Sequence, residues 1–242
     1  MQKFIRLIIL FFVMQSSFAQ SASEYLSGAN TAYKAGNYAQ AKTYFLQALA
    51  QQDTAFLNYN LANTCEKLGE IGEAKAYYMR AIYQNPRFKE AIFNLNALDK
   101  KYALSSFNTT RADLFFDELS HNEWLILSAI FLWLAIFFLI ILPFLKVNKP
   151  WQYFLGLIFI ATFALSASGV YYWNCYANTV VALVDNAPLR YSPTKDSTTS
   201  STLKAGQLAN IKKQNKDYAL LESSSKKGWA ILDNKDFMQV SN

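Results

Sequence analysis

Two stretches of similar sequence, GNYAQAKTYFLQAL (36–49) and GEIGEAKAYYMRAI (69–82), lie 33 residues apart in this chain of 242 residues. A glycine opens each stretch, and alanines and an aromatic ring recur behind it at the same spacing. Alanine lets two helices approach closely, the ring fills the space between them, and glycine suits the preceding turn. The pattern therefore predicts pairs of antiparallel helices that stack on one another.

The similarity extends beyond these stretches, since 28–49 aligns with 61–82, and Pro86 closes the second unit because proline cannot continue a helix. On these residues, 21–86 resembles two tetratricopeptide repeats, and 88–102 resembles a third first helix or a capping helix. The resemblance implies an all-α array over residues 20–103. The concave face of such an array, formed by the first helices, binds peptides or helices of partner proteins.

The concave face expected from the alignment carries amide and aromatic side chains. In repeat proteins of this kind, asparagines at such positions often bond the backbone of a bound peptide. The candidate partner-binding residues of this groove are Asn30, Tyr33, Phe56, Tyr59, Asn60, Asn63 and Asn94. The alternative is that several of the asparagines only cap helices or face solvent. Carboxylate-clamp members place lysine near Leu26 and Glu90, so capture of a C-terminal carboxylate is not expected here.

Two long runs after the repeats, 124–145 and 150–184, contain no Asp, Glu, Lys or Arg. Within them, 124–145 and 151–173 are each long enough to cross a hydrocarbon core of ~30 Å. Tryptophan and tyrosine at both ends of the second run fit the interfacial aromatic belt. We predict two transmembrane helices. Because neither contains an ionisable residue, they are expected to be anchors, and a transporter or channel subunit is disfavoured.

The orientation of this hairpin follows from the charges around it. The loop 146–150 contains Lys146 and Lys149, and the positive-inside rule places it in the cytoplasm. Residues 1–19 combine a basic start, eight apolar residues and small residues before Ala19, which is typical of a secretory signal peptide. Cleavage after Ala19 is predicted, with an uncleaved anchor as the alternative. The loop charge and the N-terminal segment, cleaved or not, place the flanking domains on the exported, periplasmic side of a bacterial inner membrane.

The juxtamembrane segment 104–123 is polar at first and then acidic and aromatic. It predicts a short interfacial helix, with a linker as the alternative. At its end, Ser120 and Glu123 have the spacing of a capping box, in which each side chain bonds a free backbone amide at the start of a helix.

Residues 177–242 form short strand-like runs separated by turn residues, which predicts a small all-β barrel or sandwich. The expected strands are Thr179–Val184, Leu189–Tyr191, Gln207–Lys212, Tyr218–Glu222, Gly228–Leu232 and Phe237–Val240. Leu189-Arg190 before Ser192-Pro193, together with Gly206 and Gly228-Trp229, resembles bacterial SH3 (SH3b) domains.

That resemblance implies binding of peptides or cell-wall material, with Arg190, Tyr191 and Trp229 as candidate ligand-binding residues. The alternative for Trp229 is a place in the core of the barrel. The lysines of this domain either form a solvated face or contact anionic lipid headgroups. They are Lys212, Lys213, Lys216, Lys226 and Lys227.

Residues suited to catalysis are scarce in this sequence. It has one histidine and two cysteines, and no nucleophile–base pair can be assembled. Cys65 falls on an inward helix position, where a free cysteine packs as a small apolar group. No segment has the dense basic stripe of a nucleic-acid-binding protein. We therefore expect a protein that is not an enzyme, with no metal, no cofactor and no nucleic-acid partner.

The predicted fold class is multi-domain: a tetratricopeptide array, a two-helix transmembrane hairpin and a small SH3-like barrel. In this order the chain resembles the tetratricopeptide component of the Bat aerotolerance operon proteins. The resemblance implies a scaffold that works beside von Willebrand-type membrane proteins and a MoxR-class ATPase in oxidative-stress tolerance. The first hypothesis is thus a membrane-anchored scaffold that binds a protein partner. The alternative is a cell-envelope anchor that binds peptidoglycan or peptide through the SH3-like domain.

Overall fold

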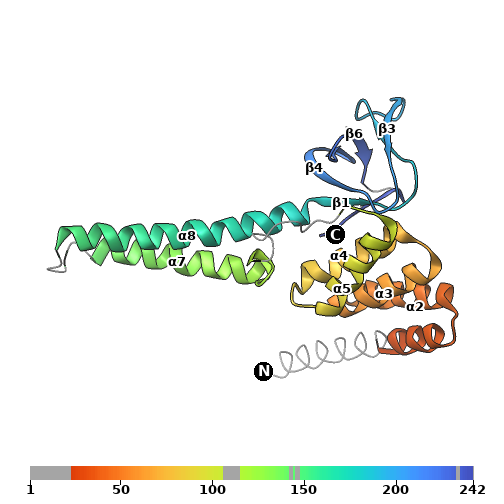
Figure 1. Cartoon of the computed structure of the whole chain (residues 1–242), viewed down its shortest axis with the longest axis horizontal. Helices are drawn as coiled ribbons and strands as arrows, with labels where there is room; N and C mark the ends of the chain where they lie inside the picture. The colour runs from red at the N-terminus through yellow and green to blue at the C-terminus, as the bar shows by residue number, and fades with distance from the viewer. Residues whose placement is uncertain (1–22, 106–114, 142–143, 145–147, 233–234, 242) are drawn as a thin grey trace, which may run out of the picture.

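The computed structural model describes residues 23–105, 115–141, 144, 148–232 and 235–241. The predicted signal peptide, 1–19, and part of the predicted juxtamembrane segment lie outside these residues. A helical array, two long apolar helices and an antiparallel sheet follow one another along the chain (Figure 1). The helical array, the pair of apolar helices and the β-structure at the C-terminal end agree with the sequence prediction at this level.

The array is built from helices of nearly equal length. A helix over residues 23–34 precedes α2 (Tyr38–Gln51), α3 (Ala55–Leu68), α4 (Ile71–Gln84) and α5 (Lys89–Tyr102). The two turn glycines, Gly36 and Gly69, both adopt the left-handed conformation with φ of 78°, which side chains disfavour. The repeated alanines and rings, Ala41, Phe45, Ala74 and Tyr78 among them, are buried between the helices, as the repeat pattern predicts.

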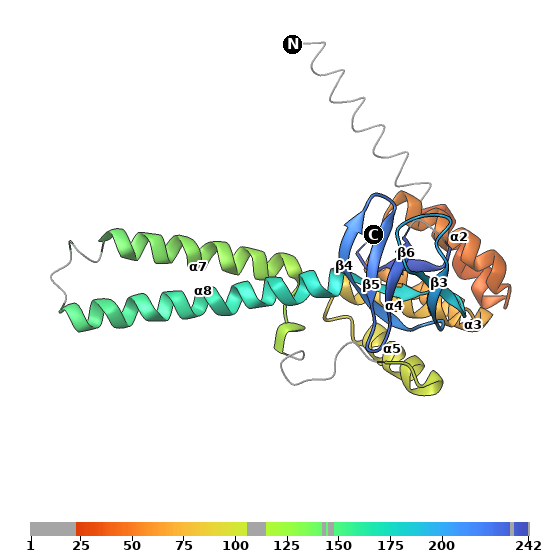
Figure 2. The same cartoon turned by 90° about the horizontal axis from the view of Figure 1, so that it is seen from above.

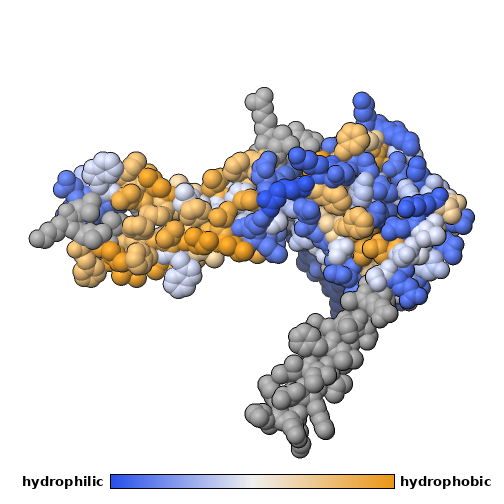
Figure 3. Space-filling view, turned by 90° about the horizontal axis from the view of Figure 1, so that it is seen from below, coloured by the Kyte–Doolittle hydropathy of each residue, from blue (hydrophilic) through white to orange (hydrophobic). Residues whose placement is uncertain are grey.

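The two apolar helices, α7 (His121–Ile141) and α8 (Lys149–Ala177), lie side by side in both views (Figures 1 and 2). Both are long and apolar enough to cross a membrane, by length and composition. Their apolar side chains form a continuous hydrophobic surface, in contrast to the mostly hydrophilic surface of the rest (Figure 3). The capping box is confirmed: Ser120 N donates to Glu123 Oε2 (2.8 Å) and Glu123 N to Ser120 Oγ (3.3 Å).

α8 is longer than the predicted span 151–173 and continues to Ala177. Trp173, which the sequence placed at the membrane interface, is fully buried in protein. The end of α8 therefore belongs to the globular part.

The C-terminal part is one antiparallel sheet of seven strands in the order β3-β2-β6-β5-β4-β1-β7. Its strands are β1 (Thr179–Ala182), β2 (Ala187–Arg190), β3 (Thr199–Leu203), β4 (Leu208–Asn215), β5 (Tyr218–Glu222), β6 (Lys227–Ile231) and β7 (Phe237–Gln239). The sequence did not predict β3, because its residues are mostly hydroxylated and carry no apolar alternation. Nor did it predict the full length of β4, which was expected to end at Lys212.

The array, the apolar helices and the sheet share one hydrophobic core. This core joins Met79 of α4, Trp124 of α7, Trp173 and Tyr176 of α8, and Val181 of β1. At Gly72 of α4, an added Cβ would lie 2.3 Å from the carbonyl oxygen of Leu183 and 2.5 Å from that of Ala182. Only glycine permits this close approach of the sheet backbone to the helix. The three parts therefore pack as one unit around α4.

Candidate partner-binding groove

The face of the array that includes α3 and α5 carries most of the predicted groove residues. α4 contacts β1, β7 and α8, so the sheet and the apolar helices occupy its side of the array. In contrast, two aromatic side chains on the other helices are open to solvent: Phe56 of α3 is 52% exposed and Phe93 of α5 is 72% exposed. These two rings are exposed apolar groups on the helices that carry the predicted groove residues.

A hydrogen-bonded cluster lies between three helices on this face. Asn63 Oδ1 of α3 accepts from the hydroxyl of Tyr78 in α4 (2.6 Å) and from Nδ2 of Asn94 in α5 (2.9 Å). The same Asn94 amide lies 3.3 Å from the hydroxyl of Tyr59. The Tyr78 hydroxyl is also 3.2 Å from Glu66 Oε2. The structure thus brings Tyr59, Asn63 and Asn94 together and adds two residues that the sequence analysis missed.

The cluster leaves the amide nitrogen of Asn63 and the carbonyl oxygen of Asn94 available. Both lone pairs of Asn63 Oδ1 are used, and the Asn94 amide nitrogen is committed. Within the described part of the chain, no hydrogen bond engages Nδ2 of Asn63 or Oδ1 of Asn94, and both residues are only half-buried. An N–H donor and a carbonyl acceptor are the two kinds of partner that a peptide group needs. The arrangement can therefore receive the backbone of an extended segment.

Burial keeps two tyrosine hydroxyl groups on this face neutral. Burial, with the nearby Glu66 carboxylate, raises the pKa of Tyr78 well above its ordinary value. Burial also raises the pKa of Tyr33, with Tyr38, Glu66 and Tyr59 contributing. Both phenols therefore remain protonated donors, and Glu66 is the charged group of the cluster.

The other predicted groove residues have different surroundings. Asn60 Nδ2 donates to the backbone oxygen of Phe56 in its own helix (3.0 Å), so this amide nitrogen bonds its own helix and not the cluster. Tyr33 packs edge-on against Tyr38, with ring centroids 5.3 Å apart. Asn30 is half-buried on the helix over residues 23–34. Tyr59 also packs against Phe88, at 4.9 Å between centroids.

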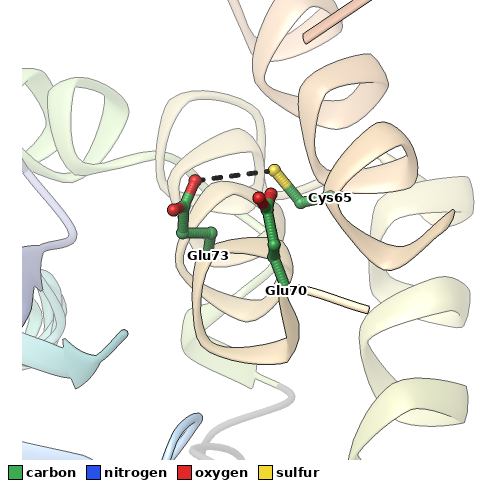
Figure 4. Close-up of side chains that lie close together, drawn as sticks. All are labelled: Cys65, Glu70 and Glu73. Atoms are coloured by element: carbon green, nitrogen blue, oxygen red, sulfur yellow. Dashed lines mark hydrogen bonds between the residues drawn. The ribbon is translucent and has the colours of Figure 1, made fainter. Parts of the chain in front are cut away.

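A second cluster contains Cys65, Glu70 and Glu73, whose potential ligand atoms all lie within 4.8 Å of one another (Figure 4). Lys42 Nζ lies 2.7 Å from Glu70 Oε2 and 2.6 Å from Glu73 Oε2, so its ammonium group bridges the two carboxylates and balances one of their two charges. Burial raises the pKa of the Cys65 thiol, and metals bind the thiolate. Lys42 and the two carboxylates therefore form a partly buried ion-pair network that links α2 to α4. We assign no metal to this cluster.

The candidate residues of the sheet are neighbours at one place. Arg190 of β2 lies opposite Trp229 of β6 in the register. The Arg190 guanidinium donates to the backbone oxygens of Ser197 (2.8 Å) and Lys195 (3.1 Å), so it fixes the loop between β2 and β3. Trp229 is half-buried and does not join the fully buried core, while Tyr191 is 72% exposed. Of the three candidates, Tyr191 is thus the most open to solvent.

Comparison with protein families supports the helical repeat. The family model for the tetratricopeptide repeat matches residues 57–88, which cover most of α3, all of α4 and the turn after it. No curated protein matches this chain. The chain therefore contains a tetratricopeptide repeat, an element that typically mediates protein–protein interaction without catalysis.

Proposed function

We propose that this chain is a non-enzymatic, membrane-anchored scaffold whose tetratricopeptide array binds a segment of a protein partner. The observation that carries this proposal is the pair of open amide groups on Asn63 and Asn94, on the same two helices that expose Phe56 and Phe93. The amides would bond the partner's backbone, and the rings would contact its side chains. Peptide grooves in repeat arrays combine the same two kinds of contact.

Membrane anchoring is supported by α7 and α8, which present large exposed apolar side chains such as Trp133, Phe137 and Leu157. In water such a surface would be costly, whereas in a bilayer it is solvated. The basic loop at 146–150 and the basic, then apolar, start of the chain favour a cytoplasmic loop. The array and the sheet would then both lie on the periplasmic side of a bacterial inner membrane.

The order of domains supports a finer proposal about the complex. A tetratricopeptide array, a hairpin and an SH3-like sheet in this order resemble the Bat aerotolerance component. The partner would then be a von Willebrand-type membrane protein or a MoxR-class ATPase complex, in oxidative-stress tolerance.

The test is co-purification from native membranes with the full-length chain carrying single substitutions. Asn63→Ala and Phe93→Ala should each reduce recovery of a specific partner about tenfold, which corresponds to the roughly 1–2 kcal/mol of a lost hydrogen bond or ring contact. Asn96→Ala is the matched control, since Asn96 is exposed on α5 outside the cluster. Phe93 is so exposed that its replacement leaves folding intact. Equal recovery with all three variants would exclude the groove as the binding site.

A second function rests on the sheet. Tyr191 is exposed and follows Arg190, the register partner of the half-buried Trp229, and aromatic groups of this kind bind peptides or sugars in SH3-like domains. The chain would then act as a cell-envelope anchor that binds peptidoglycan or peptide. Sedimentation of the full-length chain with purified cell wall tests this: saturable binding that Tyr191→Ala and Trp229→Ala abolish supports the anchor. Binding that neither substitution changes excludes it.

A further inference from the structure

β4 and β5 extend beyond the point where the sheet joins α8. β1 begins at Thr179, directly after α8, and Thr179 pairs with Asn210 of β4. Because β4 is antiparallel to β1, its remaining residues continue past the start of β1, and β5 returns from Tyr218. Both views place β4 at the end of the sheet nearest to the apolar helices (Figures 1 and 2). We call residues 211–218 the basic hairpin.

The basic hairpin is charged and open on both faces. It carries Lys212, Lys213 and Lys216 against a single acid, Asp217, and every residue from 212 to 217 is exposed. Lys212 pairs with Glu222 at 3.4 Å, where both side chains are largely exposed and the attraction is weak. In the described part of the chain, Lys213 and Lys216 have no ion pair. Ile211 packs against the core of the sheet, but residues 212 to 217 bury nothing, so packing gives no reason for the length of the hairpin beyond its base.

The hairpin cannot swing freely relative to α8. Ile211 N donates to the backbone oxygen of Asn178 (3.0 Å), and the Gln239 amide donates to that of Ala177 (3.1 Å). The last residues of α8 are thus bonded to strands on either side of β1. Two turns earlier on the same helix, Tyr171 is 71% exposed, as a tyrosine at headgroup level would be. A bilayer that α8 crosses would therefore have its surface close to the basic hairpin.

We propose that the basic hairpin binds anionic lipid headgroups of the bilayer that α7 and α8 cross. This inference rests on the proposed membrane anchoring. Each lysine close to an anionic surface strengthens the attraction roughly fivefold, so three of them form a contact that counterions at physiological salt do not abolish. The contact holds the sheet, and with it the array packed around α4, against the membrane.

The experiment uses the full-length chain in nanodiscs. A fluorophore on Gln214→Cys, in a Cys175→Ser background, reports on the hairpin, and Cys65 does not react because it is buried. Nanodiscs of phosphatidylcholine, with or without phosphatidylglycerol, carry the same trace of headgroup nitroxide lipid as quencher. We expect about twofold stronger quenching with phosphatidylglycerol, reduced to the phosphatidylcholine value by Lys212, Lys213 and Lys216→Gln or by high salt.

The matched control replaces three exposed lysines outside the hairpin, Lys34, Lys195 and Lys204, by glutamine and should leave the quenching unchanged. Equal quenching in the two lipids overturns the proposal, and so does a loss of quenching in the control that equals the loss in the hairpin variant. A chain that does not co-elute with either nanodisc overturns the membrane anchor as well. Co-elution with lipid-independent quenching overturns the lipid contact alone.

Discussion

The hydroxyl of Tyr176, in the last turn of α8, donates a hydrogen bond to the backbone oxygen of Met79 in α4 over 3.2 Å. Tyr176 is fully buried, and the ring of Tyr83 stacks on it with centroids 6.2 Å apart and an interplanar angle of 6°. The helix that leads to the sheet therefore ends inside the core of the repeat array. A partner bound in the groove would therefore be held by a repeat array that is packed firmly against the apolar helices.

Removing the Tyr176 hydroxyl tests this connection. Tyr176→Phe leaves the ring in place but loses one buried hydrogen bond, so we expect a decrease of about 1 kcal/mol in the free energy of unfolding. Thermal unfolding in detergent measures it. Tyr171→Phe, at an exposed position of the same helix, is the control and should have no effect. Identical unfolding of both variants would mean that the bond contributes nothing.

Gly72→Ala should weaken the packing of the array against the sheet. In an open helix position this change stabilises by roughly 0.4–1 kcal/mol, but here the new Cβ would lie 2.3 Å from the Leu183 oxygen. We expect a loss of about 1–3 kcal/mol and faster hydrogen exchange in β1, because the backbone must shift. Gly156→Ala, which has nothing within 4 Å, is the matched control. A more stable Gly72→Ala variant would contradict the packing around α4.

The regular parts of the fold could be predicted because their signals are local. Gly36 and Gly69 mark turns by their conformation, and the alternation of alanine with Phe45 and Tyr78 places one face of each helix in the core. β3 escaped prediction because the strand is specified by its pairing with β2, and not by apolar alternation. Such a segment becomes a strand only through its neighbours.

The site could be predicted only in part. Tyr59, Asn63 and Asn94 follow from repeat positions, but Tyr78 was assigned to packing, and its hydroxyl reaches the groove across the helix pair. Its ring satisfies the repeat pattern whether or not its hydroxyl serves the groove, so sequence spacing cannot distinguish the two roles. Trp173 presents the same difficulty, because an aromatic residue at the end of an apolar run suits both a membrane belt and a core.

The ion pair of Lys75 and Asp99 gives a pH-dependent prediction. The two side chains are almost fully buried, with Lys75 Nζ 2.7 Å from Asp99 Oδ1 and 2.6 Å from the backbone oxygen of Ser105. Burial lowers the pKa of Lys75 from 10.5, although Asp99 opposes the shift. The unfolded chain therefore binds this proton more readily than the folded one, and stability should rise with pH between the folded pKa and 10.5.

Removing one partner of this pair should destabilise the fold much more than removing both. Asp99→Asn leaves a buried ammonium without its counterion and should cost about 3–5 kcal/mol, whereas Lys75→Met with Asp99→Asn together should be nearly neutral. The double variant should also lose the alkaline rise in stability. Urea unfolding of the helical array, followed as a function of pH, measures both effects. A pH slope that persists in the double variant would assign it to another group.

Gly169 of α8 and Trp124 of α7 give the last prediction. A Cβ at Gly169 would lie 2.2 Å from the Trp124 ring, and both residues are buried where the apolar helices enter the shared core. Gly169→Ala should therefore destabilise by about 1–3 kcal/mol, because the indole cannot shift without breaking the bond from its Nε1 to the Phe116 oxygen (3.1 Å). Trp124→Ala creates a cavity of its own but removes the clash. The double variant should then be less destabilised than the sum of the two single variants, by at least about 1 kcal/mol in a double-mutant cycle. Strict additivity would show that the two helices do not meet at this pair.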